Sequence, residues 1–392
     1  MKGHNNFSDY EIPEELASDR AQLNPYPQFE TLRDESPVRY DEDRDVWDVF
    51  RYEDVNAAIT DHEVFSSEGT SHFGKHFLAS DPPDHTKLRD MVSDYFHSSH
   101  LSDLEPIIER RAEQYLSEAV SEDGTVDWLE DVAIPLPISI IADLVGIPQS
   151  KLRLYREWSE YMLGAPVDRP NTKRKETRQE MRDFFGEIAD EREKNPRDDI
   201  VSTLVQCEDA VDMFDRTLTI NTCILIMVGG HITTSTFASN AMWTFIEHDV
   251  FSDVRAGDVS LEDALEEVLR YRPAVARSDR LTTERAQLNG TEIPEGEHVI
   301  LWLASANRDE RVFDDPDEFV PGRQSEYPHM AFGRGVHTCI GNNLARLEVK
   351  TLFSKFVEKY RSANLRVAPS DLDPFYSTMI SGTEHMPIEV VE

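Results

Sequence analysis

A single cysteine in a glycine-rich turn is the residue of this sequence with the clearest chemical potential. Cys339 lies between Phe332 and Gly341, and Gly333 and Gly335 precede it in the same segment. Glycines permit tight turns and the close approach of a flat ligand. Good helix formers follow Gly341, so we expect Cys339 just before a helix start, where backbone N–H groups would lower the pKa of its thiol. The segment therefore predicts a thiolate directed at a binding site.

The pattern around this cysteine is specific to one family. It reads Phe-Gly-x-Gly-x-His-x-Cys-x-Gly, with His337 as the histidine, and chance would produce it about once in a hundred thousand such chains. It resembles the haem-binding loop of the cytochromes P-450. The resemblance implies that Cys339 is the axial ligand of the iron of haem b, with Phe332, Gly333, His337 and Gly341 beside the cofactor. A buried structural cysteine is the alternative, and it holds only if the chain lacks the rest of a haem site.

A second motif lies on a predicted helix that precedes Pro273. Ser260 and Asp263 form a capping-box pattern at its start, and apolar residues follow at helical spacing. Glu267 and Arg270 are three residues apart, so they share one helix face. An exposed ion pair of this kind contributes only a few tenths of a kcal/mol. In the family that the cysteine loop resembles, the pair is buried and has a structural role beneath the haem.

A long helix is predicted over residues 217–247, and it contains Gly229, Gly230, Thr233 and Thr234. Two adjacent glycines cost a helix about 1 kcal/mol each relative to alanine, and threonine hydroxyls compete for its backbone hydrogen bonds. We therefore expect a kink. Close helix packing explains the glycines equally well. The stretch resembles the oxygen-binding helix of the same family, which implies that these four residues form the catalytic groove over the iron.

The chain departs from the family pattern at Ile232, where an acid normally precedes Thr233. That carboxylate helps deliver protons to the reacting oxygen, which isoleucine cannot do. Three explanations stay open: another group or a water chain supplies the protons, coupling is poor, or the protein accepts a preformed peroxide.

Four further residues resemble the family's partners for the haem propionates. His85 and Arg89 lie in an Asp-Pro-Pro-x-His-x-x-x-Arg segment, Arg280 follows the Glu-x-x-Arg helix, and His337 belongs to the cysteine loop. Each alone would more often be a surface charge. The resemblance places the substrate pocket within residues 66–78 and 155–185 and at a mostly apolar set of residues, Leu225, Val228, Val275, Ala276, Met379 and Ile380. Arg277 is expected to face solvent rather than to reach a substrate carboxylate.

The composition is strongly acidic. The 392 residues carry a formal charge of −36, and only ten of the 40 basic residues are lysines. Such a charge disfavours nucleic acid as a partner and makes the protein repel itself in dilute buffer. Molar salt shortens the screening length to about 3 Å and removes that repulsion. We therefore expect a protein from a halophilic archaeon.

The three cysteines do not form a disulfide framework, and the apolar runs are too short for a membrane span. A cytoplasmic location without membrane contact follows. Helical patterns occupy residues 102–121, 149–164 and 174–194, whereas strand patterns are few: Val38–Tyr40, Val46–Phe50, His298–Ser305 and Pro387–Val391. The fold class is mainly α with small β-sheets, which the resemblance specifies as the cytochrome P-450 fold. No linker divides residues 1–392, so we expect one domain and a monomer, with a flexible polar N-terminus over residues 1–25.

Three functions are compatible with the sequence. The first is a monooxygenase that acts on a hydrophobic small molecule and receives electrons from a ferredoxin-type partner, which would dock on Lys87, Arg334, Arg346 and Lys350. The second is a peroxide-dependent oxygenase or isomerase on the same fold, which Ile232 favours. The third is a haem-binding sensor or electron carrier without catalysis. Such a protein usually has a second axial ligand, for which His231 is a remote candidate.

Overall fold

The computed structural model describes residues 12–71, 74–163, 171–208, 214–377 and 379–392. The fold is mainly helical, as predicted. Its helices are α1 (Asp19–Leu23), α2 (Tyr26–Glu35), α3 (Tyr52–Thr60), α4 (Asp84–Ser93), α5 (Ser98–Ala119), α6 (Pro135–Val145), α7 (Leu152–Leu163), α8 (Asn171–Lys194), α9 (Ile200–Glu208), α10 (Arg216–Glu247), α11 (Val250–Ala256), α12 (Leu261–Tyr271), α13 (Leu303–Ala306) and α14 (Asn342–Lys359).

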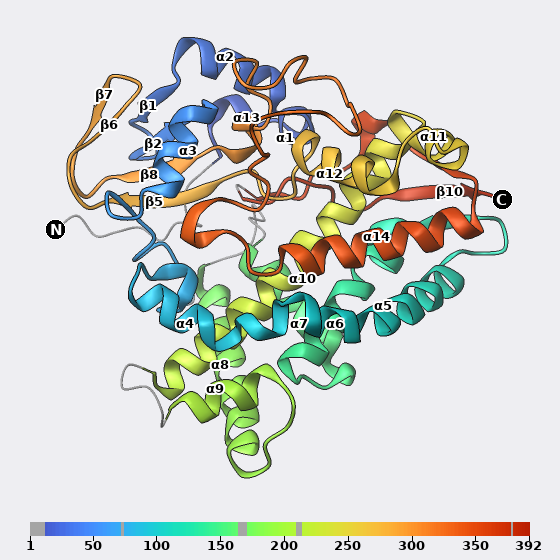
Figure 1. Cartoon of the computed structure of the whole chain (residues 1–392), viewed down its shortest axis with the longest axis horizontal. Coiled ribbons are helices and arrows are strands. Elements are labelled where there is room, and N and C mark those ends of the chain that lie inside the picture. The colour runs from blue at the N-terminus through green and yellow to red at the C-terminus, as the bar shows by residue number, and fades with distance from the viewer. Residues whose placement is uncertain (1–11, 72–73, 164–170, 209–213, 378) are drawn as a thin grey trace.

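The strands form small sheets rather than a central one. They are β1 (Val38–Asp41), β2 (Val46–Val49), β3 (Phe65–Ser66), β4 (Thr125–Asp127), β5 (Ser278–Thr282), β6 (Ala286–Leu288), β7 (Thr291–Ile293), β8 (His298–Leu301), β9 (Ser362–Leu365) and β10 (Pro387–Val391). One sheet has the order β1-β2-β8-β5-β3, another β4-β10-β9, and β6 pairs with β7. The pair β2–β8 is parallel, whereas the other pairs are antiparallel. Figure 1 shows the five-stranded sheet on one side of the molecule and α4 to α9 on the other, with α10 between them.

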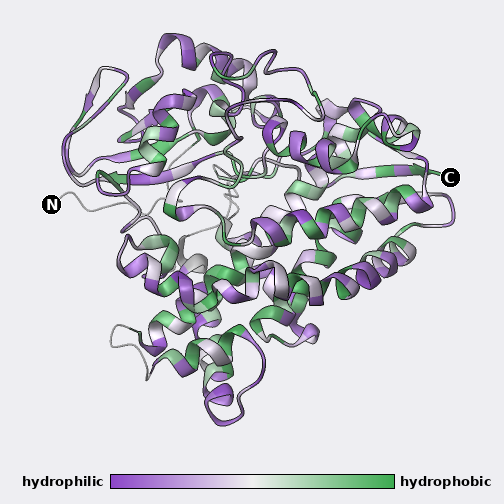
Figure 2. Cartoon of the chain, in the orientation of Figure 1, coloured by the Kyte–Doolittle hydropathy of each residue, from purple (hydrophilic) through white to green (hydrophobic). Residues whose placement is uncertain are grey.

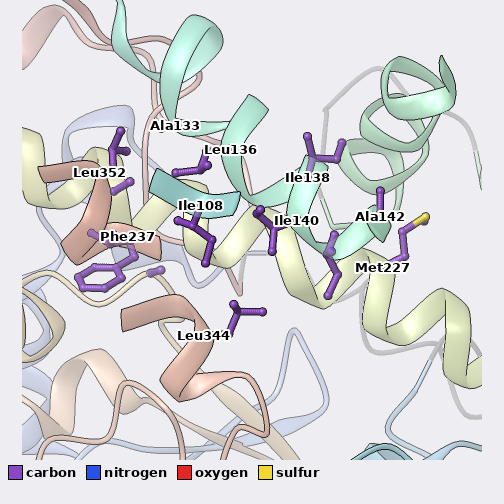
Figure 3. Close-up of a cluster of buried hydrophobic side chains, with 14 of the residues drawn as sticks. Ile108, Ala133, Leu136, Ile138, Ile140, Ala142, Met227, Phe237, Leu344 and Leu352 are labelled. Atoms are coloured by element: carbon purple, nitrogen blue, oxygen red, sulfur yellow. The ribbon is translucent and has the colours of Figure 1, made fainter. Parts of the chain in front are cut away.

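The main hydrophobic core surrounds α10. The Asp215 carboxylate caps this helix by accepting a hydrogen bond from the Leu218 N–H at 2.9 Å. Figure 3 shows side chains from α5, α6, α10 and α14 packed together, among them Ile108, Leu136, Phe237 and Leu344. Figure 2 shows that hydrophobic residues gather toward this interior and hydrophilic residues toward the outside. This core fixes α10 and α14 relative to each other, and both helices contribute to the cavity described below.

By length and composition α10 could also cross a membrane. However, 67% of its most apolar 18-residue window is buried inside the protein, as in the core helix of a globular fold.

The predicted helices agree with α5, α7 and α8, apart from their ends and residue 164, which lies outside the described residues. The helix predicted from residue 102 begins at Ser98, because Leu101 already packs into the core. The strand predicted at His298–Ser305 ends at Leu301, and the following residues form α13. Apolar runs this short do not distinguish strand from helix.

The N-terminal part of the chain also differs from expectation. Residues 1–11 of the predicted flexible segment lie outside the described residues. The rest of that segment contains a short helical turn, Glu14–Leu16, and α1. Leu16 and Ala21 are buried, so this part packs on the domain instead of extending from it.

Candidate active site

The cysteine loop forms a tight turn directly before α14. The Cys339 N–H donates to the Phe332 carbonyl at 2.8 Å, which closes the loop. Gly333 and Gly335 have φ values of 63° and 70°, a region that side chains with a Cβ rarely adopt. Cys339 lies three residues before Asn342, the first residue of α14, as the helix propensity predicted.

Cys339 opens into a cavity of about 400 Å³. Its side chain is exposed toward this cavity, which lies inside the protein. Burial raises the pKa of the thiol, while the Gly341 N–H and the charges of Arg89 and Arg346 act in the opposite direction. The predicted lowering of the pKa is therefore wrong in its net direction for the free thiol, although the helix-start N–H contributes as expected.

The two glycines of α10 have different roles, although the sequence pattern treats them alike. A Cβ added at Gly230 would lie 2.6 Å from Cγ1 of Ile141 on α6, so this glycine permits close helix packing. A Cβ at Gly229 would have no atom within 4 Å, and Gly229 lines the cavity. Both glycines line the cavity, and only Gly230 is also required for close packing, so both sequence explanations apply to Gly230.

Thr233 and Thr234 of α10 also line the cavity. The hydroxyl of Thr233 donates to the Gly229 carbonyl at 2.9 Å, and that of Thr234 donates to the Gly230 carbonyl at 3.4 Å. These bonds are the local competition with helix hydrogen bonds that the sequence predicted. The helix runs without a break from Arg216 to Glu247. A continuous helix can still bend, so the kink stays a prediction.

One edge of the cavity is cationic. Arg89, Arg280 and His337 line it. His85 stands behind this edge and is not among the described lining residues; its ring centroid lies 4.4 Å from that of His337. His337 Nε2 approaches Asp81 Oδ1 at 3.4 Å. Desolvation lowers the pKa of His85 to about 4, that of His337 below its ordinary value and that of Arg280 to about 10. Three of the four predicted partners therefore line the cavity, and the fourth, His85, packs against His337.

The Glu267–Arg270 pair is buried, so the alternative of an exposed ion pair is wrong. The side chains are 4% and 3% exposed, and two hydrogen bonds of 2.7 and 3.0 Å join them. Arg270 Nη1 also donates to the Asn307 carbonyl at 3.0 Å. The Asn307 side chain in turn accepts from the Met330 N–H at 2.7 Å. This chain of contacts fixes α12 to the segment that leads into the cysteine loop.

Five of the six residues predicted for the substrate pocket line the cavity: Leu225, Val228, Val275, Met379 and Ile380. Ala276 is not among the described lining residues, although Val275 and Arg277 on either side of it are. Ala276 instead packs into a core cluster with Phe29 and Trp302. Within the predicted ranges 66–78 and 155–185, the described lining residues are Thr70, Ser71, His76, Phe77, Leu78 and Met162.

Two other expectations can be compared with the structure. Arg277 does not face solvent: its side chain is 1% exposed, it lines the cavity, and its Nη2 lies 3.7 Å from Asp279 Oδ1. His231, the remote candidate for a second axial ligand, is buried and bonds through Nδ1 to the Met227 carbonyl at 3.0 Å. It is not among the described residues that line the cavity.

The sequence reasoning missed Asp279 and Ile141, which also line the cavity. Asp279 could have been noticed because it stands next to Arg280 and two residues after Arg277 in an extended segment. Ile141 carried no signal, since an apolar residue in an apolar helix is normally core.

Comparison with known proteins agrees with this geometry. Residues 260–381 match the family model described as Cytochrome P450. "Cytochrome P450 109" of Bacillus spizizenii is 35% identical over 385 residues, which cover 96% of this chain and 94% of that protein. The chain belongs to the cytochrome P450 family. The erythromycin C-12 hydroxylase of Saccharopolyspora erythraea is 33% identical, with 91% of this chain and 92% of that protein covered. This chain is therefore a cytochrome P450 monooxygenase.

Solved structures of the family have the same fold. The crystal structure of CYP109E1 from Bacillus megaterium in complex with testosterone matches with a TM-score of 0.89 and 31% identity, covering 95% of this chain and 99% of that one. A mutant of P450 EryK in complex with erythromycin B matches with a TM-score of 0.86 and 30% identity, covering 95% and 98%.

The family implies a haem cofactor, and the residues present fit it. A haem needs a thiolate on one face and cationic or N–H partners for two propionates at a buried edge. Cys339 would supply the first, and Arg89, Arg280 and His337 line the part of the cavity that would hold the second. Both ring nitrogens of buried His85 and Nε of Arg280 have no hydrogen-bond partner among the described residues, as expected of groups arranged around an additional ligand.

Proposed function

We propose that this chain is a single haem-thiolate domain that inserts one atom of dioxygen into a hydrophobic small molecule. The cofactor is haem b held by Cys339, and the electrons come from a ferredoxin-type donor. The supporting observation is the cavity, which Cys339 lines together with Gly229 and Thr233 of α10. Each turnover consumes one dioxygen, two electrons, two protons and one substrate molecule, and it yields hydroxylated product and water.

Four residues at the cavity, Cys339, Gly341, Gly229 and Thr233, each have a defined role in this proposal. Bound haem supplies the oxidising chemistry, because a thiolate ligand favours cleavage of the O–O bond. The Gly341 N–H tunes the charge on the Cys339 sulfur. Gly229 leaves space for a diatomic molecule, since no atom lies within 4 Å of where its Cβ would be. Thr233 keeps a hydroxyl proton next to that space.

The lining supports an apolar substrate such as a fatty acid, a terpene or a steroid. Phe77, Leu225, Val228 and Met379 present carbon atoms to the cavity. Its volume of about 400 Å³ lies at the lower end of the range for ligand sites. The bound haem would occupy part of that volume. Relatives of the same fold form complexes with testosterone and with erythromycin B, so a steroid and a macrolide are both candidate substrates.

The docking surface for a ferredoxin is more restricted than the sequence suggests. Arg346 forms an ion pair with Glu266 at 2.9 Å, and Lys350 pairs with Glu262. An acidic partner would have to compete with both glutamates. Lys87, which is exposed, and Arg334 would then contribute more of the electrostatic attraction to the ferredoxin. Product formation with reduced ferredoxin as the only electron source tests the partner class.

A peroxide-dependent reaction is the second candidate, and Ile232 favours it. Ile232 is 8% exposed, and no proton can pass through its side chain. If proton delivery limits the ferredoxin-driven reaction, Ile232→Glu should increase the product formed per electron pair by about twofold or more, because positioned acids contribute ~10²–10⁴-fold to proton transfers. The measurement compares product with electrons consumed, and Ile232→Leu is the control of similar volume.

The same assay separates the two functions. Product with reduced ferredoxin and dioxygen supports the monooxygenase. Product with hydrogen peroxide alone, together with unchanged coupling in Ile232→Glu, would replace the first proposal by the second.

We also propose a cytoplasmic monomer adapted to high salt, on the basis of the charge of −36. Self-repulsion should lower the midpoint of thermal unfolding in salt-free buffer, and molar potassium chloride should raise it because screening removes the repulsion. The midpoint and the retained haem absorbance are measured in both buffers. Equal midpoints with full haem retention would contradict the adaptation, while leaving the enzymatic proposal untouched.

A further inference from the structure

Ser377 lines the cavity and was not singled out by the sequence. Its hydroxyl oxygen accepts hydrogen bonds from the N–H groups of Met379 and Ile380 at 3.2 and 3.1 Å. We propose that the hydroxyl proton of Ser377 is donated to a neutral oxygen of the hydrophobic substrate, such as a ketone, ester or ether oxygen. This inference rests on the proposed monooxygenase function and specifies the substrate class for the same cavity.

Two backbone donors decide which role is left to this hydroxyl. A serine hydroxyl has one proton to donate and two lone pairs that accept. The N–H groups of Met379 and Ile380 occupy the lone pairs, in the manner of serines that bond to the backbone two and three residues later. Among the described residues, none accepts a hydrogen bond from Ser377 Oγ. The proton is therefore left for a molecule in the cavity.

The segment that carries Ser377 is held in place by backbone contacts on two sides. On one side, the Ser381 N–H donates to the Ala274 carbonyl at 2.9 Å. On the other side, Asn240 Nδ2 of α10 donates to the Ser381 carbonyl at 2.9 Å. The donor thus has a defined place relative to α10 before a substrate binds, so little freedom is lost when the hydrogen bond forms.

A single neutral donor suits a neutral oxygen better than a carboxylate. Burial of an ionised carboxylate costs far more than burial of a ketone unless a cation pairs with it. Arg89 and Arg280 match the two propionates of haem b, and Asp279, 3.7 Å from Arg277, adds a negative charge to the lining. The charge of −36 on the whole chain also repels anions in dilute buffer.

The competing acceptor is water in a neighbouring pocket. Ser377 and Ile380 also line this smaller pocket of about 40 Å³, which Phe29 and Trp302 border. A pocket of this size has room for water. A hydroxyl that bonds only to water there would not distinguish one substrate from another. A hydroxyl that faces the main cavity would lose its partner when an analogue without the oxygen covers it, which is the basis of discrimination.

Three probes of similar size test the inference: 2-undecanone, 2-methyl-1-undecene and undecanoate. The alkene has the shape of the ketone, with a CH₂ group in place of the carbonyl oxygen. Dissociation constants are measured from the shift in haem absorbance of the holoenzyme, without an electron donor. Ser377→Ala should weaken binding of the ketone about fivefold, because a neutral hydrogen bond is lost, and should change binding of the alkene by less than about twofold. Undecanoate should bind more weakly than the ketone to the unmodified protein.

Two further variants locate the effect at one hydroxyl. Ser377→Thr keeps the hydroxyl and should keep the ratio of ketone to alkene affinity. Ser381→Ala is the matched control, because Ser381 belongs to the same segment, is not among the described residues that line the main cavity, and makes its hydrogen bonds through the backbone. This variant should also keep the ratio.

The outcomes separate this inference from the proposed function. Equal weakening of ketone and alkene in Ser377→Ala would make the hydroxyl a support of its own segment and overturn the inference. Unchanged binding of both would assign the proton to the smaller pocket, and tightest binding of undecanoate would replace the neutral oxygen by a carboxylate; either result also overturns it. Failure of all three probes to bind the unmodified holoenzyme would instead contradict the proposed hydrophobic substrate itself.

Discussion

Replacing Cys339 with serine should abolish monooxygenase turnover, with a loss of about 1,000-fold or more, equivalent to ~4 kcal/mol of transition-state stabilisation. The serine hydroxyl has nearly the same size as the thiol but does not ionise near neutral pH, so it cannot donate the electron density that favours O–O cleavage. The spectrum of the reduced, carbon-monoxide-bound protein reports the axial ligand directly. It should change from that of a thiolate complex to that of a complex without sulfur.

The control for this experiment is Cys207→Ser. Cys207 is half-buried at the end of α9, and it is not among the described residues that line the cavity. This variant should keep both the spectrum and the turnover of the unmodified protein. A thiolate spectrum that survives in Cys339→Ser, or that disappears in Cys207→Ser, would assign the axial ligand to another residue.

The loop that carries Cys339 was predictable because its information is local. Gly333 and Gly335 adopt positive φ, a conformation that glycine tolerates and most residues do not. The start of α12 was predictable for the same reason: the Ser260 hydroxyl accepts a hydrogen bond from the Asp263 N–H at 3.0 Å, as the capping pattern indicated. Turn and cap signals are encoded within a few residues, so they need no knowledge of the rest of the fold.

Features that depend on packing between distant segments were not predictable. Arg277 was assigned to solvent because arginines are rarely buried, whereas the segment that carries it packs against Met379 and Ile380 and its side chain is buried. The role of Gly230 depends on Ile141, which lies 89 positions away in the sequence on another helix. The net pKa shift of Cys339 likewise depends on how closely the surrounding protein encloses the thiol, which the loop sequence does not specify.

The buried network of Glu267 and Arg270 gives the second large expected effect, on stability. Besides the two hydrogen bonds to Glu267, Arg270 donates to the carbonyls of Asn307, Pro316 and Glu318 at 2.7–3.0 Å. Removing one partner of a buried ion pair typically costs about 3–5 kcal/mol, because the other charge stays buried without compensation. Here Glu267 keeps Arg323 Nε at 3.0 Å, and the Glu318 carbonyl keeps Arg323 Nη2 at 2.9 Å. The carbonyls of Asn307 and Pro316 are the ones that lose the donor Arg270.

Because Arg323 still pairs with Glu267, Arg270→Leu should lower the free energy of unfolding by about 3 kcal/mol, the lower end of that range. The measurement is urea unfolding of the holoenzyme, with circular dichroism and haem absorbance as probes. Arg270→Lys should recover little, since a lysine cannot form two parallel bonds to Glu267 and reach the three carbonyls. Arg285→Leu removes an exposed ion pair with Glu292 and should cost less than about 0.5 kcal/mol. Equal losses in Arg270→Leu and Arg285→Leu would mean that the buried pair adds nothing beyond an ordinary surface contact.

Because Asn307 also bonds to Met330 ahead of the cysteine loop, haem release should begin at lower urea than global unfolding in Arg270→Leu. The order of the two transitions thus reports whether this network holds the loop or only the helix.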